Sequence, residues 1–300
     1  MKIHYIYESD GDAWGIIASE RNFKKNNIFF SFSKEMNIPK KIDALLIQSN
    51  VLQETYLNTN VPIFIRDKID GAQLGSARKF INHKNVIKVF KGYCLSPGYL
   101  NNETSNRYFL EKRIPKEKID YTKIVSGHGF GAYKRIVEKA SQASLRKKRT
   151  LDVVFHGTTN YKKIIKISDH RKDAVKAIQK YSENKLCSYN KNLSHRKYMK
   201  TLEISFSCVS PFGYGEACYR DYEALMAGAV LIKPYMSHIS CNPNIYIPGK
   251  TYIPCSSDFK DLEQCVQEAK QISNKQRVRN KQLALHGFSD LVNIYSRYLN

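Results

Sequence analysis

The sequence lacks long apolar runs and contains a single tryptophan. Its longest nearly unbroken apolar stretch, residues 224–232, is far shorter than the roughly 18 residues that a helix needs to cross a bilayer. An integral membrane protein is therefore excluded. The first eight residues have no long apolar core and no small-residue cleavage site, so we expect no secretory signal.

Paired cysteines are also missing. The seven cysteines are scattered, and no two of them stand in a Cys-x-x-Cys arrangement. This excludes a zinc ribbon and a thioredoxin motif. We expect reduced, mostly buried thiols in a reducing compartment, and hence a cytoplasmic protein.

Acidic residues are scarce relative to basic ones. The chain has 49 Lys and Arg against 27 Asp and Glu, which gives a net charge of +22 and a pI near 9.6. The basic clusters lie at 134–149, 160–172 and 191–200. Such charge favours polyanionic partners: nucleic acid, an anionic membrane surface or phosphorylated small molecules. The net charge does not distinguish among these three classes of partner. Lysine-rich surfaces also arise from a biased coding composition, which the abundance of Lys, Asn and Ile indicates.

A chain of 300 residues is long enough for about two domains. Short apolar segments predict strands at 2–7, 28–32, 42–48, 61–65, 86–90, 151–155, 202–207, 229–234 and 252–254. Helical patterns predict helices at 16–25, 72–82, 161–167, 171–181, 261–272 and 275–298, with a loop at 8–15. Buried strands that alternate with helices are typical of parallel α/β sheets.

The basic stretch at 134–150 carries little apolar pattern at its end, which indicates a linker. We predict a first domain over 1–148 and a second over 149–280. A terminal helix over 281–300 is expected to pack back toward the first domain. Ligands of such folds bind in the cleft between the domains.

The most informative segment is a glycine-rich loop that leads into a helix. Gly213, Tyr214 and Gly215 let the backbone approach a ligand closely, and the predicted helix begins near Glu216. The positive end of that helix favours an anionic phosphate. Gly228 is expected to end the helix before the next strand.

Arg220 and Glu223 lie three residues apart and therefore share a face of this helix. A guanidinium can pair with diphosphate oxygens, and a carboxylate can accept two hydrogen bonds from a ribose diol. The same spacing equally suits a surface ion pair beside a plain turn. Lys233 ends the next strand, a position at which lysine is typically solvated.

The run from Gly213 through Glu223 to Gly228 resembles the donor-binding segment of GT-B glycosyltransferases, most closely exostosin-like enzymes and bacterial family 1 glycosyltransferases. Flanking similarities lie at 194–198, 207–209, 236–238 and 252–254, and the resemblance covers roughly residues 151–270. It implies an α/β GT-B-like fold of two Rossmann-like domains facing across a cleft. The first domain would then be the acceptor side and the second would bind the nucleotide sugar.

The resemblance also implies site roles. Arg220 would pair with the donor diphosphate and Glu223 would hold the donor ribose. Further donor contacts would come from Gly213, Tyr214, Gly215, Glu216, His156 and Arg171. Glu216 and Glu223 are separated by six residues rather than the seven of many retaining GT-B enzymes, which leaves retention or inversion open.

Transfer also requires a base for the acceptor hydroxyl and stabilisation of the leaving diphosphate. Asp12 and Asp70 are our candidates for the base, although loop capping is the commoner role of such aspartates. Asp10-Gly11-Asp12 has the spacing of a metal-binding Asp-x-Asp motif but not its strand-end setting. We therefore expect no cofactor and no metal.

These observations predict a nucleotide-sugar-dependent hexosyl- or pentosyltransferase. It would move a sugar, from a UDP-sugar in the favoured case, to a hydroxyl of a glycan or lipid-linked acceptor. Peripheral attachment to an anionic membrane would follow from the basic surface. Three alternatives stay open: a transferase acting on nucleic acid such as a modified DNA base, a basic nucleic-acid-binding protein without catalysis, and a scaffold with a degenerate transferase fold.

Overall fold

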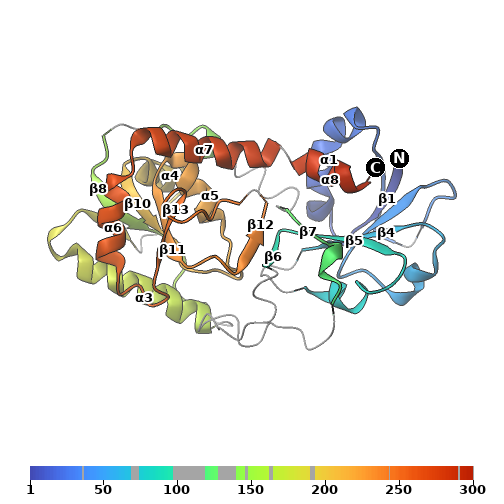
Figure 1. Cartoon of the computed structure of the whole chain (residues 1–300), viewed down its shortest axis with the longest axis horizontal. Coiled ribbons are helices and arrows are strands. Elements are labelled where there is room, and N and C mark those ends of the chain that lie inside the picture. Colours follow the sequence, from blue (N-terminus) through green and yellow to red (C-terminus); the bar gives the residue numbers. More distant parts are fainter. Residues whose placement is uncertain are drawn as a thin grey trace.

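The structure is a computed structural model that describes residues 1–35, 37–68, 74–96, 119–127, 140–145, 148–161, 165–189, 193–242, 244–289 and 291–299. Its strands form two parallel sheets, one in each half of the chain, and helices cover them (Figure 1). The chain is thus an α/β protein with two domains, as the alternation of strands and helices predicts.

The sheet of the first half has six parallel strands in the order β2-β1-β3-β4-β5-β7. The strands are β1 (Lys2–Ile6), β2 (Phe29–Ser33), β3 (Ala44–Gln48), β4 (Ile63–Asp67), β5 (Val86–Lys91) and β7 (Ile124–Ser126). Every residue of β3 and β4 is buried, because helices and loops cover both faces at the centre of the sheet. One face packs against α1 (Asp10–Lys25) through Ile16 and Phe23.

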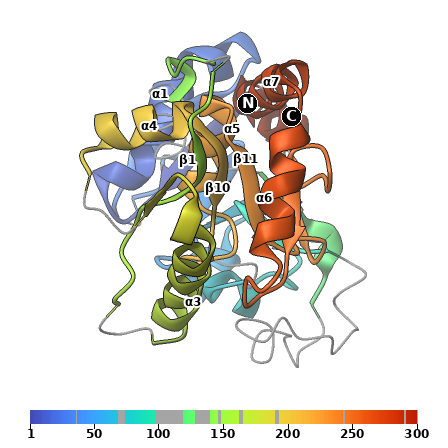
Figure 2. The same cartoon turned by 90° about the vertical axis from the view of Figure 1, so that its left-hand side faces the viewer.

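The sheet of the second half has five parallel strands in the order β13-β11-β10-β8-β9. The strands are β8 (Leu151–Phe155), β9 (Cys187–Tyr189), β10 (Ser205–Val209), β11 (Val230–Pro234) and β13 (Tyr252–Cys255). Residues of α3 (Ile165–Tyr181) and α6 (Leu262–Gln271) form the core on one face. Residues of α4 (His195–Glu203) and α5 (Tyr219–Ala227) form it on the other, and Figure 2 shows α4 and α6 on opposite sides of the strands.

A small antiparallel sheet and the last two helices link the two halves. The short strand β6 (Tyr93–Leu95), just after β5, pairs antiparallel with β12 (Ile239–Cys241), which follows β11. The carboxyl edges of the two sheets therefore face the same region between the domains. The chain then crosses back along α7 (Asn274–Ser289), which packs against α5, to α8 (Leu291–Leu299) (Figure 1). There the Tyr295 ring lies 4.1 Å from that of Phe90, centroid to centroid.

Several local predictions are wrong. Residues 10–15 are the first turns of α1 rather than loop, because burial of Ile16 and Phe23 outweighs the low helix propensity of Gly11 and Gly15. The helix predicted over 72–82 is a short 3-10 helix, Ser76–Lys79, within the described part of that range. The segments 161–167 and 171–181 contribute to one helix, α3, and Leu202 belongs to α4 rather than to the strand that follows. Where the domain boundaries fall stays a prediction.

All seven cysteines are free thiols, and Cys208, Cys241, Cys255 and Cys265 are buried. Burial raises the pKa of Cys208 to about 12. Among the described helices, none combines the length and the apolar character required to traverse a bilayer.

Arg277 fixes α7 to the second domain. Its buried guanidinium donates hydrogen bonds to four backbone carbonyl oxygens, those of Phe206, Gly228, Ala269 and Ile272, at 2.7–3.1 Å. Phe206 lies in β10, Gly228 is the C-cap of α5, and Ala269 and Ile272 lie at the end of α6. Arg277 thus links one strand and the ends of two helices to α7.

We expect Arg277→Ala to lower the free energy of unfolding by about 3 kcal/mol, because several buried acceptors lose their donor together. Urea unfolding followed by circular dichroism measures the change. Arg279→Ala, at an exposed position two residues further along α7, is the matched control. Equal stability of the two variants would show that Arg277 does not anchor the helix.

Candidate functional site

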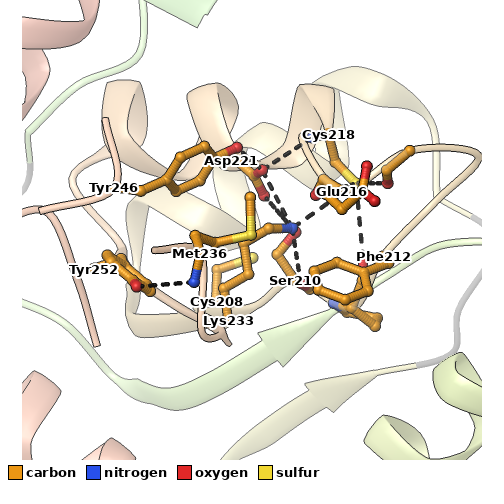
Figure 3. A network of polar contacts seen from close by, with 12 residues as sticks. Cys208, Ser210, Phe212, Glu216, Cys218, Asp221, Lys233, Met236, Tyr246 and Tyr252 are labelled. Atoms are coloured by element: carbon orange, nitrogen blue, oxygen red, sulfur yellow. Dashed lines mark hydrogen bonds and ion pairs between the residues drawn. The ribbon is translucent and has the colours of Figure 1, made fainter. Parts of the chain in front are cut away.

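The glycine-rich loop between β10 and α5 is held by one buried carboxylate. Asp221 is fully buried and accepts hydrogen bonds from the Ser210 hydroxyl (2.5 Å), the Cys218 backbone N–H (2.9 Å) and the Tyr246 hydroxyl (2.6 Å) (Figure 3). Ser210 lies at the beginning of the loop, Cys218 at its end, and Tyr246 in the segment that follows β12 (Ile239–Cys241). Asp221 therefore determines the shape of the whole loop.

Lys233 neutralises this carboxylate. Its Nζ lies 3.3 Å from each oxygen of Asp221 and donates to the Ser210 carbonyl at 3.2 Å (Figure 3). The expectation that Lys233 is solvated is wrong, because β11 lies inside the sheet and the loop covers its carboxyl end. A buried lysine needs such a partner, since an unpaired charge in the interior is very costly.

The helix begins later than the sequence indicates. Helix α5 starts at Tyr219, not near Glu216, and Cys218 is its N-cap. The Asp221 side chain accepts from the Cys218 backbone N–H, which favours a start at this point. Gly228, in the left-handed conformation, ends α5 as predicted.

The loop residues divide into buried and exposed ones. Gly213 donates from its backbone N–H to the Gly215 carbonyl at 3.0 Å, which closes a tight turn. Glu216 is fully buried beneath the loop, so its side chain does not reach solvent. Tyr214 is 56% exposed, and its ring packs edge-on against Tyr161 at 5.5 Å. Of these four residues, Tyr214 offers the largest exposed surface to a ligand.

Two arginines from different helices meet beside this loop. Arg220 of α5 donates to the His156 carbonyl at 3.0 Å, and its guanidinium lies over the Phe155 ring. Arg171 of α3 donates to the carbonyls of Phe212 (3.0 Å) and Thr158 (2.8 Å). Neither arginine forms an ion pair with a carboxylate in the part of the chain that the structure describes.

Gly157 shows how close the two guanidinium groups are. A Cβ on Gly157 would lie 2.5 Å from Nη2 of Arg220 and 3.8 Å from Nη1 of Arg171. Burial, followed by the charge of Arg220, lowers the pKa of Arg171. Two adjacent cations without a carboxylate are electrostatically unfavourable in isolation and are suited to a bound anion with several oxygens.

His170 lies beneath the same loop and adds no further charge. Its ring is fully buried against Phe212 and Phe259. Burial and then the positive charges of Lys233 and Arg171 lower the pKa of His170 to about 3. The ring is therefore neutral at physiological pH, and Nδ1 accepts the Phe212 backbone N–H at 3.2 Å.

Glu223 does not pair with Arg220, so the simple i,i+3 surface ion pair is not formed. Instead its Oε1 accepts a hydrogen bond from Nε2 of His195, the first residue of α4, at 3.0 Å. The sequence reasoning missed this role of His195. The similarity at 194–198 was the signal that pointed to the segment.

His156 contributes to the site through its backbone. Its carbonyl accepts from Arg220, whereas the Nε2 atom of its ring is 3.0 Å from the Ser188 hydroxyl on the neighbouring strand. The structure thus brings together His156, Arg171, Arg220 and the loop at 213–215, with Glu223 one helical turn beyond Arg220.

Of the two proposed bases, only Asp12 lies within the described residues. Asp12 lies in α1 rather than in a loop, so the loop setting expected for it is wrong. Asp70 lies outside the described residues. Nearby, Asp67 is buried and accepts hydrogen bonds from the Ser49 hydroxyl and the Gly75 backbone N–H, which indicates a structural role.

Over the described residues, no group of three or more His, Cys, Asp or Glu side chains is arranged to hold a metal ion. We assign no metal ligands, and a metal-independent reaction stays a prediction.

No protein-family model matches the chain, and no curated protein matches it in sequence. A glycosyltransferase from Rickettsia africae ESF-5 is similar in structure, with 12% sequence identity, a TM-score of 0.50 and coverage of 99% of this chain and 96% of that chain. The chain has the GT-B fold. At this identity the likeness establishes the fold and not the reaction.

Two other solved structures are more distant. The UDP-GlcNAc 2-epimerase from Neisseria meningitidis, bound to UDP-GlcNAc, has 11% identity and a TM-score of 0.45, with 100% of this chain and 99% of that chain covered. An alpha-glucosyltransferase in complex with UDP and a 13-mer DNA has 10% identity and a TM-score of 0.45, with 98% of each chain covered. The exostosin-like subgroup stays a prediction.

We expect Gly157→Ala to weaken binding of inorganic pyrophosphate about tenfold, because the new methyl group displaces the Arg220 guanidinium. Stability should change by less than about 1 kcal/mol, since the displaced group is the end of a flexible side chain. Calorimetric titration and thermal unfolding measure the two effects. Gly92→Ala is the control, because its Cβ would meet only one atom, at 3.9 Å. Unchanged pyrophosphate affinity would show that the arginines do not bind this anion.

Proposed function

We propose that the protein transfers a sugar from a nucleotide-diphosphate sugar, with UDP as the favoured nucleotide, to a hydroxyl of a glycan or lipid-linked acceptor. The observation that carries this proposal is the pair Arg171 and Arg220, which meet at Gly157 without a carboxylate. The GT-B fold and the carboxyl edges that face each other between the domains support it.

The donor would lie across the start of α5. Its diphosphate would bind Arg220 and Arg171, which donate planar, permanently charged N–H groups. Glu223, one turn further along the same helix face, would accept hydrogen bonds from the ribose hydroxyls. Tyr214, exposed at the loop tip, would pack against the sugar or the base.

The leaving group explains why two arginines are needed. As the glycosidic bond breaks, negative charge builds up on the diphosphate oxygens, and fixed cations lower the energy of that state. Guanidinium groups supply this stabilisation without a proton transfer. Both arginines are already held by backbone carbonyls, so little reorganisation accompanies the reaction.

The acceptor hydroxyl must lose its proton to a base on the first domain. Asp12 and Asp70 remain our proposals for this base. The residues around Gly213, Gly215 and Glu216 would shape the sugar pocket through their backbone, since Glu216 is buried. No cofactor enters this scheme. A cytoplasmic protein that attaches peripherally to anionic membranes also remains our proposal.

We expect Arg220→Ala to lower kcat/KM for the preferred nucleotide sugar at least about 100-fold, because a charge that stabilises the leaving group is lost. A panel of nucleotide sugars with release of free nucleoside diphosphate as the readout identifies the donor and measures the effect. Arg220→Lys should recover only part of the activity, since a lysine does not reproduce the planar fork. If Arg220→Ala turns over like the Arg279→Ala control, the diphosphate site is misassigned.

A second candidate is the same transfer to nucleic acid, and the exposed face of α4 favours it. Arg196, Lys197 and Lys200 are exposed, and no ion pair with them occurs among the described residues. The lysines of α3 differ from the cations of α4, because two of them form ion pairs. Lys172 and Lys176 are each paired with the aspartate three residues earlier, with Nζ to Oδ1 distances of 3.9 and 3.6 Å.

These cations also occupy an unfavourable place in α4. Arg196 and Lys197 lie in its first turn, which has no acidic residue and where the helix dipole disfavours positive charge. The same end of α4 carries His195, which contacts Glu223. A polyanion on this face would therefore approach the donor site.

If nucleic acid binds here, replacing Arg196, Lys197 and Lys200 by glutamate should weaken duplex DNA binding at least about tenfold and reduce its dependence on salt. Fluorescence anisotropy over a salt series measures both. The control replaces the exposed Lys172, Lys176 and Lys180 of α3. Equal losses in both variants would indicate nonspecific attraction to the net charge rather than an acceptor surface.

A further inference from the structure

Among the described residues, His195 is the one side chain that donates a hydrogen bond to Glu223. Its Nε2 donates to Oε1 at 3.0 Å. The Glu223 side chain is 10% exposed, whereas that of His195 is 48% exposed. The histidine therefore reaches from the surface to a carboxylate that is nearly enclosed.

The contact with His195 restricts the orientation of the Glu223 carboxylate. A glutamate side chain has three rotatable bonds, and ordering it costs conformational entropy. The His195 hydrogen bond holds one oxygen and thereby limits the orientations that the carboxylate can adopt. Oε2 remains to accept hydrogen bonds, because no described residue donates to it.

His195 is itself held in place. It is the first residue of α4, whose backbone packs on α5 and β10. Its ring packs against that of Tyr198, one turn later, with centroids 6.4 Å apart. The Tyr198 ring also lies edge-on to the His156 ring, with centroids 6.3 Å apart. A row of rings thus connects the end of β8, where Arg220 binds the backbone, to the residue that orients Glu223.

We propose that His195 is a positioning residue that sets the preference of this site for ribonucleotides over 2′-deoxyribonucleotides. This inference rests on the proposed function, in which Glu223 binds the ribose. With Oε1 held by His195, the carboxylate accepts from the vicinal 2′- and 3′-hydroxyls in one fixed orientation. A 2′-deoxyribose offers only one of these donors.

The experiment measures binding rather than turnover. Calorimetric titrations use UDP, ADP, GDP and CDP, then the 2′-deoxy counterpart of the tightest ligand, and inorganic pyrophosphate as the probe for the arginines alone. The variants are His195→Ala and His195→Gln, whose amide N–H can replace Nε2–H. The control is Arg279→Ala, which removes an exposed cation of α7. Thermal unfolding checks that each variant is folded.

We expect His195→Ala to weaken binding of the ribonucleotide about tenfold, the factor that corresponds to about 1.4 kcal/mol, a typical value for one hydrogen bond to a charged group. The preference over the 2′-deoxynucleotide should fall toward one, and pyrophosphate affinity should stay unchanged. His195→Gln should restore most of the preference, and Arg279→Ala should retain all of it.

Two results would overturn the inference while leaving the proposed function intact. One is an unchanged ribose preference in His195→Ala. The other is an equal loss of affinity for all three ligands, which would show a general structural role. If the wild-type protein binds neither a nucleoside diphosphate nor pyrophosphate, the proposed function fails and this inference fails with it.

Discussion

The ion pair between Asp221 and Lys233 is the interaction on which the site depends. It is completely buried, and its charges are balanced by hydrogen bonds from Ser210, Cys218 and Tyr246. Removing either partner would leave an uncompensated charge in the interior, which is far more costly than the pair itself. The pair thereby joins the carboxyl ends of β10 and β11 to the first turn of α5, and it fixes the loop between them.

The described part of the second domain contains two kinds of buried charge, an ion pair and two arginines without a carboxylate partner. Asp221 and Lys233 neutralise each other, whereas Arg171 and Arg220 lie side by side and donate to uncharged groups, which are backbone carbonyls and the Tyr161 hydroxyl. Carbonyl dipoles hold a guanidinium in position but leave its net charge in place. The neutral pair therefore provides rigidity, and the unneutralised pair provides attraction for an anion. In our proposal, this division of roles makes the start of α5 the donor-binding site.

Much of the fold was predictable from local pattern. Continuous apolar runs such as those of β3, β4 and β11 occur where both faces of a parallel strand are covered, and the structure buries them as expected. The three-residue spacing of Arg220 and Glu223 put them on one helix face, and Gly228 ended that helix. The residues at which helices begin were less predictable. Gly11 and Gly15 suggested a loop, but because Ile16 and Phe23 pack in the core, residues 10–15 are helical.

The sequence by itself determined the parallel α/β class, the loop-to-helix segment and the residue types available for a phosphate site. Only the tertiary structure decided which residues meet there. Arg171 reaches Arg220 across Gly157 from another helix, His195 reaches Glu223 over 28 positions of sequence, and Lys233 becomes buried because a loop folds over its strand. Local propensity carries no information about such contacts, because each arises from the packing of elements that are distant in the chain.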